Sequence, residues 1–174
     1  MKRWAMIAMG LLSLWGCFAT LTARDQQPGG VAPTALQGFA APPLDLPTLA
    51  GGTLTLASLR GKPVLLNFWA TWCPECRQEL PTLQRFQREE GSRLDVVGID
   101  VQEPRGVVRG FVRQRALGWT FLLDEQGVAA TAYGVRVLPT SFFLDAKGVV
   151  RQTHIGPMTL GEMRGFARSA GVGG

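Results

Sequence analysis

Two cysteines separated by two residues form the part of the sequence best suited to chemistry. They belong to the run Trp72-Cys73-Pro74-Glu75-Cys76, which stands where a predicted buried strand gives way to a predicted helix. Cysteines at this spacing can close a disulfide within one helical turn, and Pro74 suits the first helical position. Unpaired N–H groups and the helix dipole favour a thiolate at a helix start. We therefore expect Cys73 to be the attacking thiol and Cys76, one turn deeper, to be the resolving thiol.

The same two cysteines have two simpler interpretations, an inert disulfide and half of a metal site. A tetrahedral zinc site needs four ligands. The third cysteine, Cys17, lies in an N-terminal apolar segment, and the single histidine, His154, lies in a predicted strand far along the chain. We expect no metal site, and we interpret His154 as an ordinary strand residue.

The residues on either side of the cysteines predict the elements that hold them. Residues 63–69 form a continuous apolar run, which is typical of a strand buried on both faces. Residues 74–90 contain helix formers, with Gly91 as a stop and with Pro81 at a place where it should kink the helix. The apolar stripe of this helix consists of Leu80, Leu83 and Phe86.

The rest of the chain alternates strand and helix patterns without an internal repeat. A hairpin is predicted over 44–56, where a Gly-Gly pair precedes a short alternating run. Further strands are expected over 94–101, 120–123, 140–144 and 149–155, and further helices over 104–116, 128–133 and 159–170. This order predicts an α/β fold with one sheet and helices on both faces.

Residues 1–21 have the pattern of a membrane anchor or a signal segment. Lys2 and Arg3 precede an apolar stretch long enough to span a bilayer core, and the next cation is Arg24. This charge pattern places the N-terminus inside and the rest of the chain outside the cytoplasm. A cleaved signal peptide and a lipid attached at Cys17 are the alternatives, and both also place the folded part outside.

Residues 22–38 are interpreted as a flexible linker. They are rich in proline and glycine and contain few large apolar side chains. We expect the folded domain over 39–174, a length sufficient for a single hydrophobic core.

The net charge of +5, from 18 Lys and Arg against 13 Asp and Glu, raises the question of a nucleic-acid partner. Phosphate binding needs clustered cations. Here the arginines are spread singly, without a basic stripe or an interleaved aromatic platform. We therefore expect no nucleic-acid partner.

Two sequence blocks resemble a known family. The run from Asn67 to Pro81 resembles the active-site segment of the TlpA/ResA group of bacterial thiol–disulfide oxidoreductases, and Tyr133 to Asp145, followed by Gly148, resembles its second block. The resemblance covers about residues 39–170. It implies a thioredoxin-like fold with an N-terminal β-hairpin extension and a central αβ insertion.

The same resemblance implies a location and partners. Members are tethered outside the cytoplasmic membrane and mostly act as reductants, several of them in cytochrome c maturation. It implies a place on the periplasmic side of the bacterial envelope, protein disulfide substrates with apocytochrome c as a candidate, and a membrane dithiol carrier as electron donor. The redox group would be the Cys73–Cys76 disulfide, with no other cofactor.

The resemblance also implies roles for residues near the cysteines. It assigns Pro139 to the position of the family's cis-proline, which faces the active-site cysteines. Leu138 would then offer its backbone to a docked substrate strand, and its side chain would cover the disulfide. Trp72 is a candidate for the partner-docking surface, together with Pro74, whereas Trp69 is expected in or beside the core.

Glu79 is the expected proton carrier. Thioredoxins have a buried acid six residues before the first cysteine, where this chain has Asn67, which cannot relay a proton. Glu79 lies three residues after Cys76, on the same helical face, and matches a glutamate of the TlpA/ResA group. We expect its carboxylate to accept or return a proton during exchange. The alternative is an exposed helix charge.

Some charged groups near Cys73 stabilise its thiolate, and others destabilise it. The helix start and Arg77 favour the thiolate, whereas Glu75 and Glu79 raise the thiol pKa. Because two carboxylates oppose one arginine, we expect a reducing couple.

Two other functions are compatible with a reactive cysteine in this setting. A thiol peroxidase of the peroxiredoxin type uses Pro-x-x-x-Thr-x-x-Cys, but Thr71 stands two residues before Cys73 and no proline has the required offset. A copper metallochaperone of thioredoxin fold resembles Cys-x-x-x-Cys with a distal histidine, and the spacing here is one residue shorter.

Overall fold

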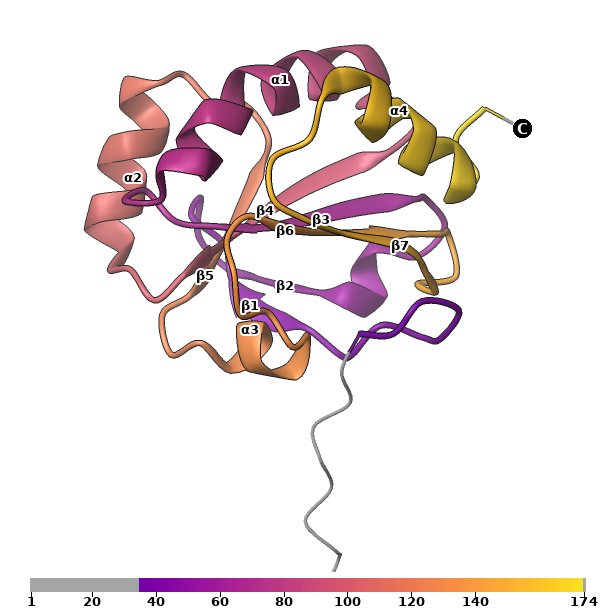
Figure 1. The fold of residues 1–174 in the computed structure, drawn as a ribbon. Coiled ribbons are helices and arrows are strands. Elements are labelled where there is room, and N and C mark those ends of the chain that lie inside the picture. Colours follow the sequence, from indigo (N-terminus) through magenta and orange to yellow (C-terminus); the bar gives the residue numbers. More distant parts are fainter. Residues whose placement is uncertain (1–34, 174) are drawn as a thin grey trace, which may run out of the picture. The chain divides into compact units, whose positions relative to one another are not determined.

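The strand that leads to the cysteines lies at the centre of a five-stranded sheet (Figure 1). The computed structural model describes residues 35–173. The sheet order is β5-β4-β3-β6-β7, with β4 and β5 parallel to β3 and with β6 and β7 completing the other side through antiparallel pairs. The bounds are β3 (Val64–Trp69), β4 (Asp95–Val101), β5 (Thr120–Asp124), β6 (Thr140–Leu144) and β7 (Val150–Ile155). Every strand expected from the sequence is present, within two residues at its ends.

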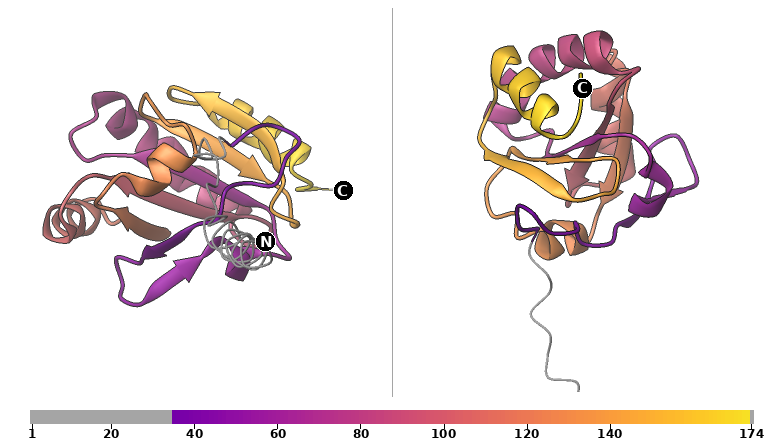
Figure 2. Two further views of the ribbon diagram at one scale, coloured as in Figure 1. Left: turned by 90° about the horizontal axis from the view of Figure 1, so that it is seen from below. Right: turned by 90° about the vertical axis from the view of Figure 1, so that its right-hand side faces the viewer.

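Helices cover both faces of this sheet, as the element order predicts (Figures 1 and 2). Helices α1 and α4 pack side by side on one face, whereas α3 and the β1–β2 hairpin lie on the other. The bounds are α1 (Pro74–Glu90), α2 (Arg105–Gln114), α3 (Val128–Ala132), α4 (Leu160–Ser169), β1 (Asp45–Pro47), β2 (Thr53–Thr55) and a short 3₁₀ helix, Leu56–Leu59. The hairpin and the α2–β5 segment are the predicted extension and insertion.

All six residues of β3 are buried, because the strand contributes to the cores on both faces. Leu66 and Phe68 pack with the hairpin and α3, whereas Leu65 packs with α1 and α4. Trp69 lies in a third apolar cluster together with both cysteines and α2. The prediction from the continuous apolar run 63–69, a strand buried on both faces, is confirmed. This strand fixes the position from which the chain enters the cysteine loop.

Helix α1 is held against the sheet by its apolar stripe. Leu80, Leu83 and Phe86 are all buried, and Phe86 is 0% exposed. Pro81 lies inside the helix, and Gly91 caps its end through a backbone N–H that donates to the Gln87 carbonyl.

The folded part takes in residues just before the expected boundary at 39. Ala35 is buried in the core, and the Gly38 N–H donates to the Val150 carbonyl at 2.7 Å. The predicted segment 1–21 with Cys17, and most of the linker 22–38, lie outside the described residues. Between residues 35 and 173, no helix is long and apolar enough to span a membrane.

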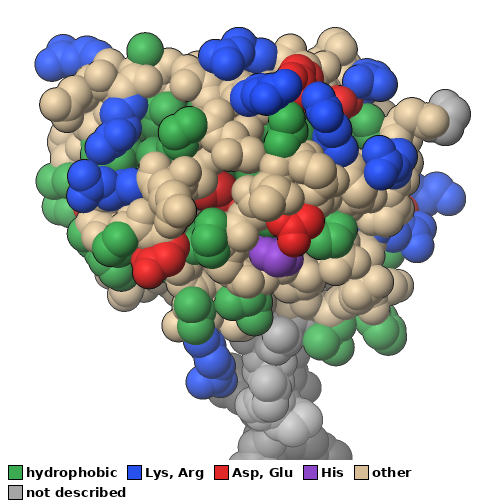
Figure 3. Space-filling model, turned by 45° about the horizontal axis from the view of Figure 1, so that its top comes forward, with side chains coloured by type: hydrophobic (Ala, Val, Ile, Leu, Met, Phe, Trp, Pro, Cys, Tyr) green, Lys and Arg blue, Asp and Glu red, His purple; other side chains and the backbone are tan. Residues whose placement is uncertain are grey.

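Lys and Arg side chains are dispersed over the face shown in Figure 3. Several of them gather at the upper right of this view beside Asp and Glu side chains, and others lie apart.

Replacing Phe86 by alanine should lower the free energy of unfolding by about 3–5 kcal/mol, because a large apolar side chain in a packed core is deleted. Urea unfolding of the two proteins measures the difference. Gln78→Ala, an exposed position on the same helix, serves as control and should change stability by no more than about 0.5 kcal/mol. Equal losses in the two variants would contradict the packing of α1.

Candidate functional site

Cys73 and Cys76 form a disulfide at the first turn of α1. The S–S distance is 2.16 Å and the Cα–Cα distance is 5.3 Å. Cys73 is the N-cap residue, and its sulfur accepts a hydrogen bond from the Cys76 backbone N–H at 3.1 Å. This N–H is one of those that a helix start leaves without an intrahelical partner. The first cysteine therefore lies where a thiolate gains from hydrogen bonding and from the helix dipole.

The local sequence explains this placement. Strand β3 ends at Trp69, and the Cys73 N–H donates to the Ala70 carbonyl at 3.3 Å, which closes a tight turn before the helix. Pro74 occupies the first helical turn, where it loses no hydrogen bond. Both cysteines are nearly covered, at 2% and 1% exposure.

Leu138 and Trp72 lie together next to the covered disulfide. Leu138 is half-buried and packs against the apolar cluster that contains both cysteines. The peptide bond from Leu138 to the buried Pro139 is cis. Trp72 is 64% exposed, and it lines a small cavity of about 250 Å³ together with Leu138 and Arg136. Pro74, two residues after Trp72, is also exposed. Trp69 is buried, as expected.

Glu79, three residues after Cys76 in α1, is buried and not exposed on the helix. It is 2% exposed. One carboxyl oxygen accepts from the Met158 N–H at 2.8 Å and the other from the Asn67 side chain at 3.2 Å. The Asn67 amide also donates to the Ser141 hydroxyl at 3.0 Å. Three segments of the chain thus meet at the carboxyl group, and a fourth, β6, joins them through Asn67.

Burial raises the pKa of Glu79 to about 7, although its hydrogen bonds from Met158 and Asn67 lower it in part. Loss of hydration disfavours the charged form, and two hydrogen bonds do not replace a full shell of water. A carboxyl group with a pKa near the operating pH both accepts and returns a proton readily.

Two further acids close to the cysteine loop were not found from the sequence. Glu103 accepts from the Thr71 backbone N–H at 2.5 Å and from the Thr71 hydroxyl at 2.6 Å. Asp100, at the end of β4, is fully buried beside it. The signal in the sequence is Asp100 inside the apolar run 94–101, followed three residues later by Glu103.

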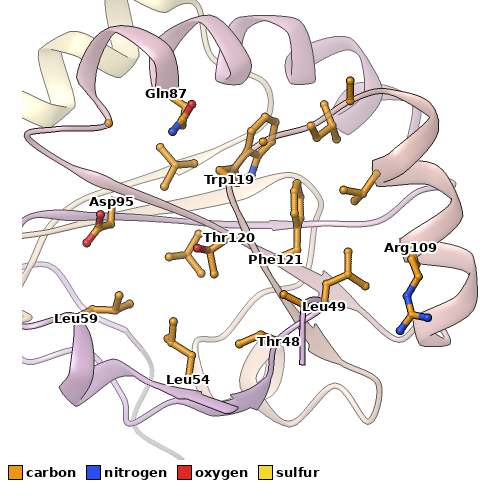
Figure 4. Close-up of a pocket in the computed structure, with 18 of the residues that line it drawn as sticks. Thr48, Leu49, Leu54, Leu59, Gln87, Asp95, Arg109, Trp119, Thr120 and Phe121 are labelled. Carbon is orange, nitrogen blue, oxygen red and sulfur yellow. The ribbon is translucent and has the colours of Figure 1, made fainter. Parts of the chain in front are cut away.

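A larger cavity, of about 1040 Å³, lies between the β5 edge, α2 and the chain near the hairpin (Figure 4). Trp119 and Phe121 point into it, with Leu49 and Arg109 on its other sides. Neither cysteine lines this cavity, so it is not the place of thiol chemistry.

Among residues 35–173, no three His, Cys, Asp or Glu residues gather so as to hold a metal ion. His154 lies in β7 with its ring 5.6 Å from that of Phe166. It does not join the cysteines in a cluster of ligands.

A model of the AhpC/TSA family matches residues 38–153, which include both cysteines and Glu79. The chain belongs to this family. Among its relatives is the thioredoxin-like protein YneN of Bacillus subtilis, 41% identical over 73% of this chain and 76% of that protein. The thiol:disulfide interchange protein DsbE of Pseudomonas fluorescens is 35% identical over 90% of this chain and 86% of that protein. The thiol-disulfide oxidoreductase ResA of Bacillus anthracis is 32% identical over 80% and 88%.

Solved structures of the same class superpose on this AhpC/TSA-family chain. A DsbE protein from Chlorobium tepidum gives a TM-score of 0.73 at 29% identity, covering 79% of this chain and 99% of that one. StoA from Bacillus subtilis gives 0.64 at 29% identity, covering 71% and 95%. The fold is therefore thioredoxin-like, and the protein is a thiol–disulfide oxidoreductase with a Cys-x-x-Cys pair, as the sequence predicts.

Replacing Glu79 by glutamine should remove a pH-dependent loss of stability. A carboxyl group whose pKa is raised in the folded state stabilises the fold fully below its unfolded value, 4.5, and loses that contribution as the pH rises through about 7. Wild type should therefore lose roughly 3 kcal/mol more than Glu79→Gln between these pH values. Urea unfolding at a series of pH values measures the difference. Parallel curves for the two proteins would show that Glu79 is not buried as described.

Proposed function

We propose that this protein is a dithiol reductant of disulfides in proteins of the bacterial cell envelope, tethered to the cytoplasmic membrane on its periplasmic side. The observation that carries the proposal is the Cys73–Cys76 pair at the start of α1, with a buried carboxyl group of pKa about 7 one turn further along the helix. This arrangement combines an activated sulfur, a second sulfur within reach and a group able to exchange a proton.

In the proposed reaction the Cys73 thiolate attacks one sulfur of a substrate disulfide. An S–S bond forms between Cys73 and the substrate, and the other substrate sulfur leaves as a thiolate. Cys76 then loses its proton to the Glu79 carboxylate and attacks the Cys73 sulfur, which releases the second substrate sulfur. Two electrons pass to the substrate, and the Cys73–Cys76 disulfide remains as the oxidised product. The pair is proposed to be the only redox group, without a further cofactor.

We assign substrate docking to Trp72, Pro74, Leu138 and Pro139. Trp72 is a large exposed aromatic side chain, of the kind that is enriched where partners bind. Leu138 precedes the cis-proline and packs against the cluster containing the cysteines. An extended substrate segment that pairs with its backbone would pass directly over the disulfide.

The proposed partners and location rest on the sequence and on the relatives. Two structural relatives are described as a secreted disulfide oxidoreductase of Mycobacterium tuberculosis and an exposed lipoprotein thioredoxin of Streptococcus pneumoniae. Residues 1–21 have the pattern of an anchor. We propose apocytochrome c among the protein disulfide substrates and a membrane dithiol carrier as the electron donor.

The other two functions are less well supported. In the peroxiredoxin motif a threonine hydroxyl assists the cysteine, but the Thr71 hydroxyl is engaged by Glu103. Rapid consumption of one equivalent of peroxide by Cys73 would favour a peroxidase. Tight Cu(I) binding that is lost in His154→Ala would favour a metallochaperone.

Cys76→Ser should trap the substrate. Without the resolving thiol, the mixed disulfide on Cys73 cannot be released, so covalent complexes should accumulate in envelope extract. They are identified by non-reducing electrophoresis and mass spectrometry. Cys73→Ser, which lacks the attacking thiol, is the matched control and should capture nothing and abolish turnover. Equal capture by both variants would contradict the assigned roles.

The reduction potential of the cysteine pair should lie well below that of strong periplasmic oxidants, about −120 mV. Above about pH 7, Glu79→Gln removes a buried negative charge that opposes the thiolate and should therefore raise the potential. The rise is about 30 mV for each unit by which the Cys73 pKa falls. Equilibration with a thiol redox buffer measures both values. Glu162→Gln, an exposed acid of the same charge, should leave the potential unchanged, and a fall in Glu79→Gln would refute the argument.

A further inference from the structure

Asp100 is a buried acid that the proposed reaction does not use. Its side chain is 0% exposed at the end of β4, where it pairs in register with Trp69 of β3 and Leu123 of β5. The Glu103 backbone N–H lies near it, but among residues 35–173 neither carboxyl oxygen of Asp100 has a partner with hydrogen-bond geometry. A buried carboxylate without donors carries a large desolvation cost.

Glu103, the acid beside Asp100, is hydrogen-bonded to the loop that leads to Cys73. Both oxygens of the Glu103 carboxyl are occupied by Thr71, one by the backbone N–H and one by the hydroxyl. Thr71 stands two residues before the attacking cysteine and directly before exposed Trp72. Glu103, which is 7% exposed, therefore holds this turn through two hydrogen bonds, in addition to the bond from Cys73 to Ala70 within the turn.

The charged groups that act on Asp100 are both acids. Within the described part of the chain they are Glu103 and Asp124, and each raises the pKa of Asp100. The Asp124 oxygens accept from the backbone N–H groups of Ala129 and Ala130, at 3.2 and 2.8 Å, at the start of α3. Burial is the largest cause and, with these acids, brings the pKa of Asp100 to about 9. Two neighbouring carboxyl groups with no cation between them cannot both ionise cheaply.

If Asp100 carries a proton, its carboxyl group gains a hydrogen-bond partner. A carboxylic acid has an O–H to donate, and the neighbouring Glu103 carboxyl, which raises the pKa of Asp100, has acceptor oxygens to receive it. Glu103 would then receive three hydrogen bonds, two from Thr71 and one from Asp100. Asp100 would be a neutral acid, which costs less free energy to bury than a carboxylate.

We propose that Asp100 holds a proton that it donates to Glu103, and that this pair is a positioning device which fixes the Thr71 turn and thereby the attacking Cys73. Neither residue touches the reacting sulfurs in this proposal. Its consequence for exchange rests on the proposed dithiol function, but the shared proton itself does not.

The proton is expected to leave Asp100 in a pH range of its own. Glu79 titrates near pH 7 and Asp100 near pH 9. Above that range a second buried anion appears beside Glu103, and the contact with Thr71 should weaken. The turn before Cys73 should therefore loosen in a step that is separate from the titration of Glu79.

The test follows the Thr71 backbone amide by NMR in the oxidised full-length protein in neutral detergent, from about pH 7 to about pH 10. The wild-type resonance should shift with a midpoint near pH 9. Asp100→Asn keeps a donor toward Glu103 and removes the titrating group, so its resonance should stay constant. Asp95→Asn makes the same change at the half-buried start of β4, where Asp95 pairs with Lys62, and should titrate like wild type. A constant wild-type resonance, or an equal shift in Asp100→Asn, would overturn the proposal.

Glu103→Gln tests the coupling and does not depend on whether Asp100→Asn folds. Without the neighbouring charge, the midpoint followed at the Trp72 amide should fall by about one pH unit or more; an unchanged midpoint refutes the pair. The reduced protein passes two electrons to oxidised glutathione, which becomes two glutathione thiols while the Cys73–Cys76 disulfide forms; the rate of this reaction should depart from simple thiol titration near pH 9 in wild type and not in Asp100→Asn. Because the NMR titration uses no substrate, it tests the Asp100–Glu103 pair independently of the reductase function.

Discussion

The backbone N–H groups at the start of α1 have no partners within the helix, and the Cys73 sulfur takes one of them. This hydrogen bond forms only if the sulfur has a fixed position relative to the start of the helix. Strand β3 fixes the start of the cysteine loop, because the strand is buried on both faces and paired with β4 and β6. The apolar stripe of α1 fixes the helix on the same sheet. The rest of the fold serves to keep a strand end and a helix start in register.

The cluster around the disulfide is apolar, yet polar groups lie directly behind it. Glu79 accepts a hydrogen bond from Met158, in the segment just before α4, and another from Asn67 of β3. Such a group costs free energy to bury, and its hydrogen bonds offset only part of that cost, so its pKa rises toward 7. Placed there, a carboxyl group changes its charge within the range in which thiols exchange protons, which an exposed glutamate would not do.

The sequence was sufficient for the elements and for the reactive pair. The stripe on α1, the unbroken run of β3 and the two-residue spacing of the cysteines are local patterns, and local patterns predict local structure. Burial of Glu79 was open, because a glutamate three residues after Cys76 is equally compatible with solvent. Its partner Met158 is far away in sequence. The pair of Asp100 and Glu103 was missed for the same reason, because its role depends on Thr71, which follows the neighbouring strand β3 and is distant in sequence.

Buried acids near one disulfide differ in what surrounds them, and this separates their chemistry. Glu79 receives hydrogen bonds from a backbone N–H and an amide, which stabilise its anion, and its pKa stays near the range of thiol exchange. Asp100 faces two other acids and has no well-aligned donor among residues 35–173, so its proton is retained to about pH 9. The first environment suits a group that passes a proton in the proposed reaction. The second suits one that keeps a proton and holds a loop in place.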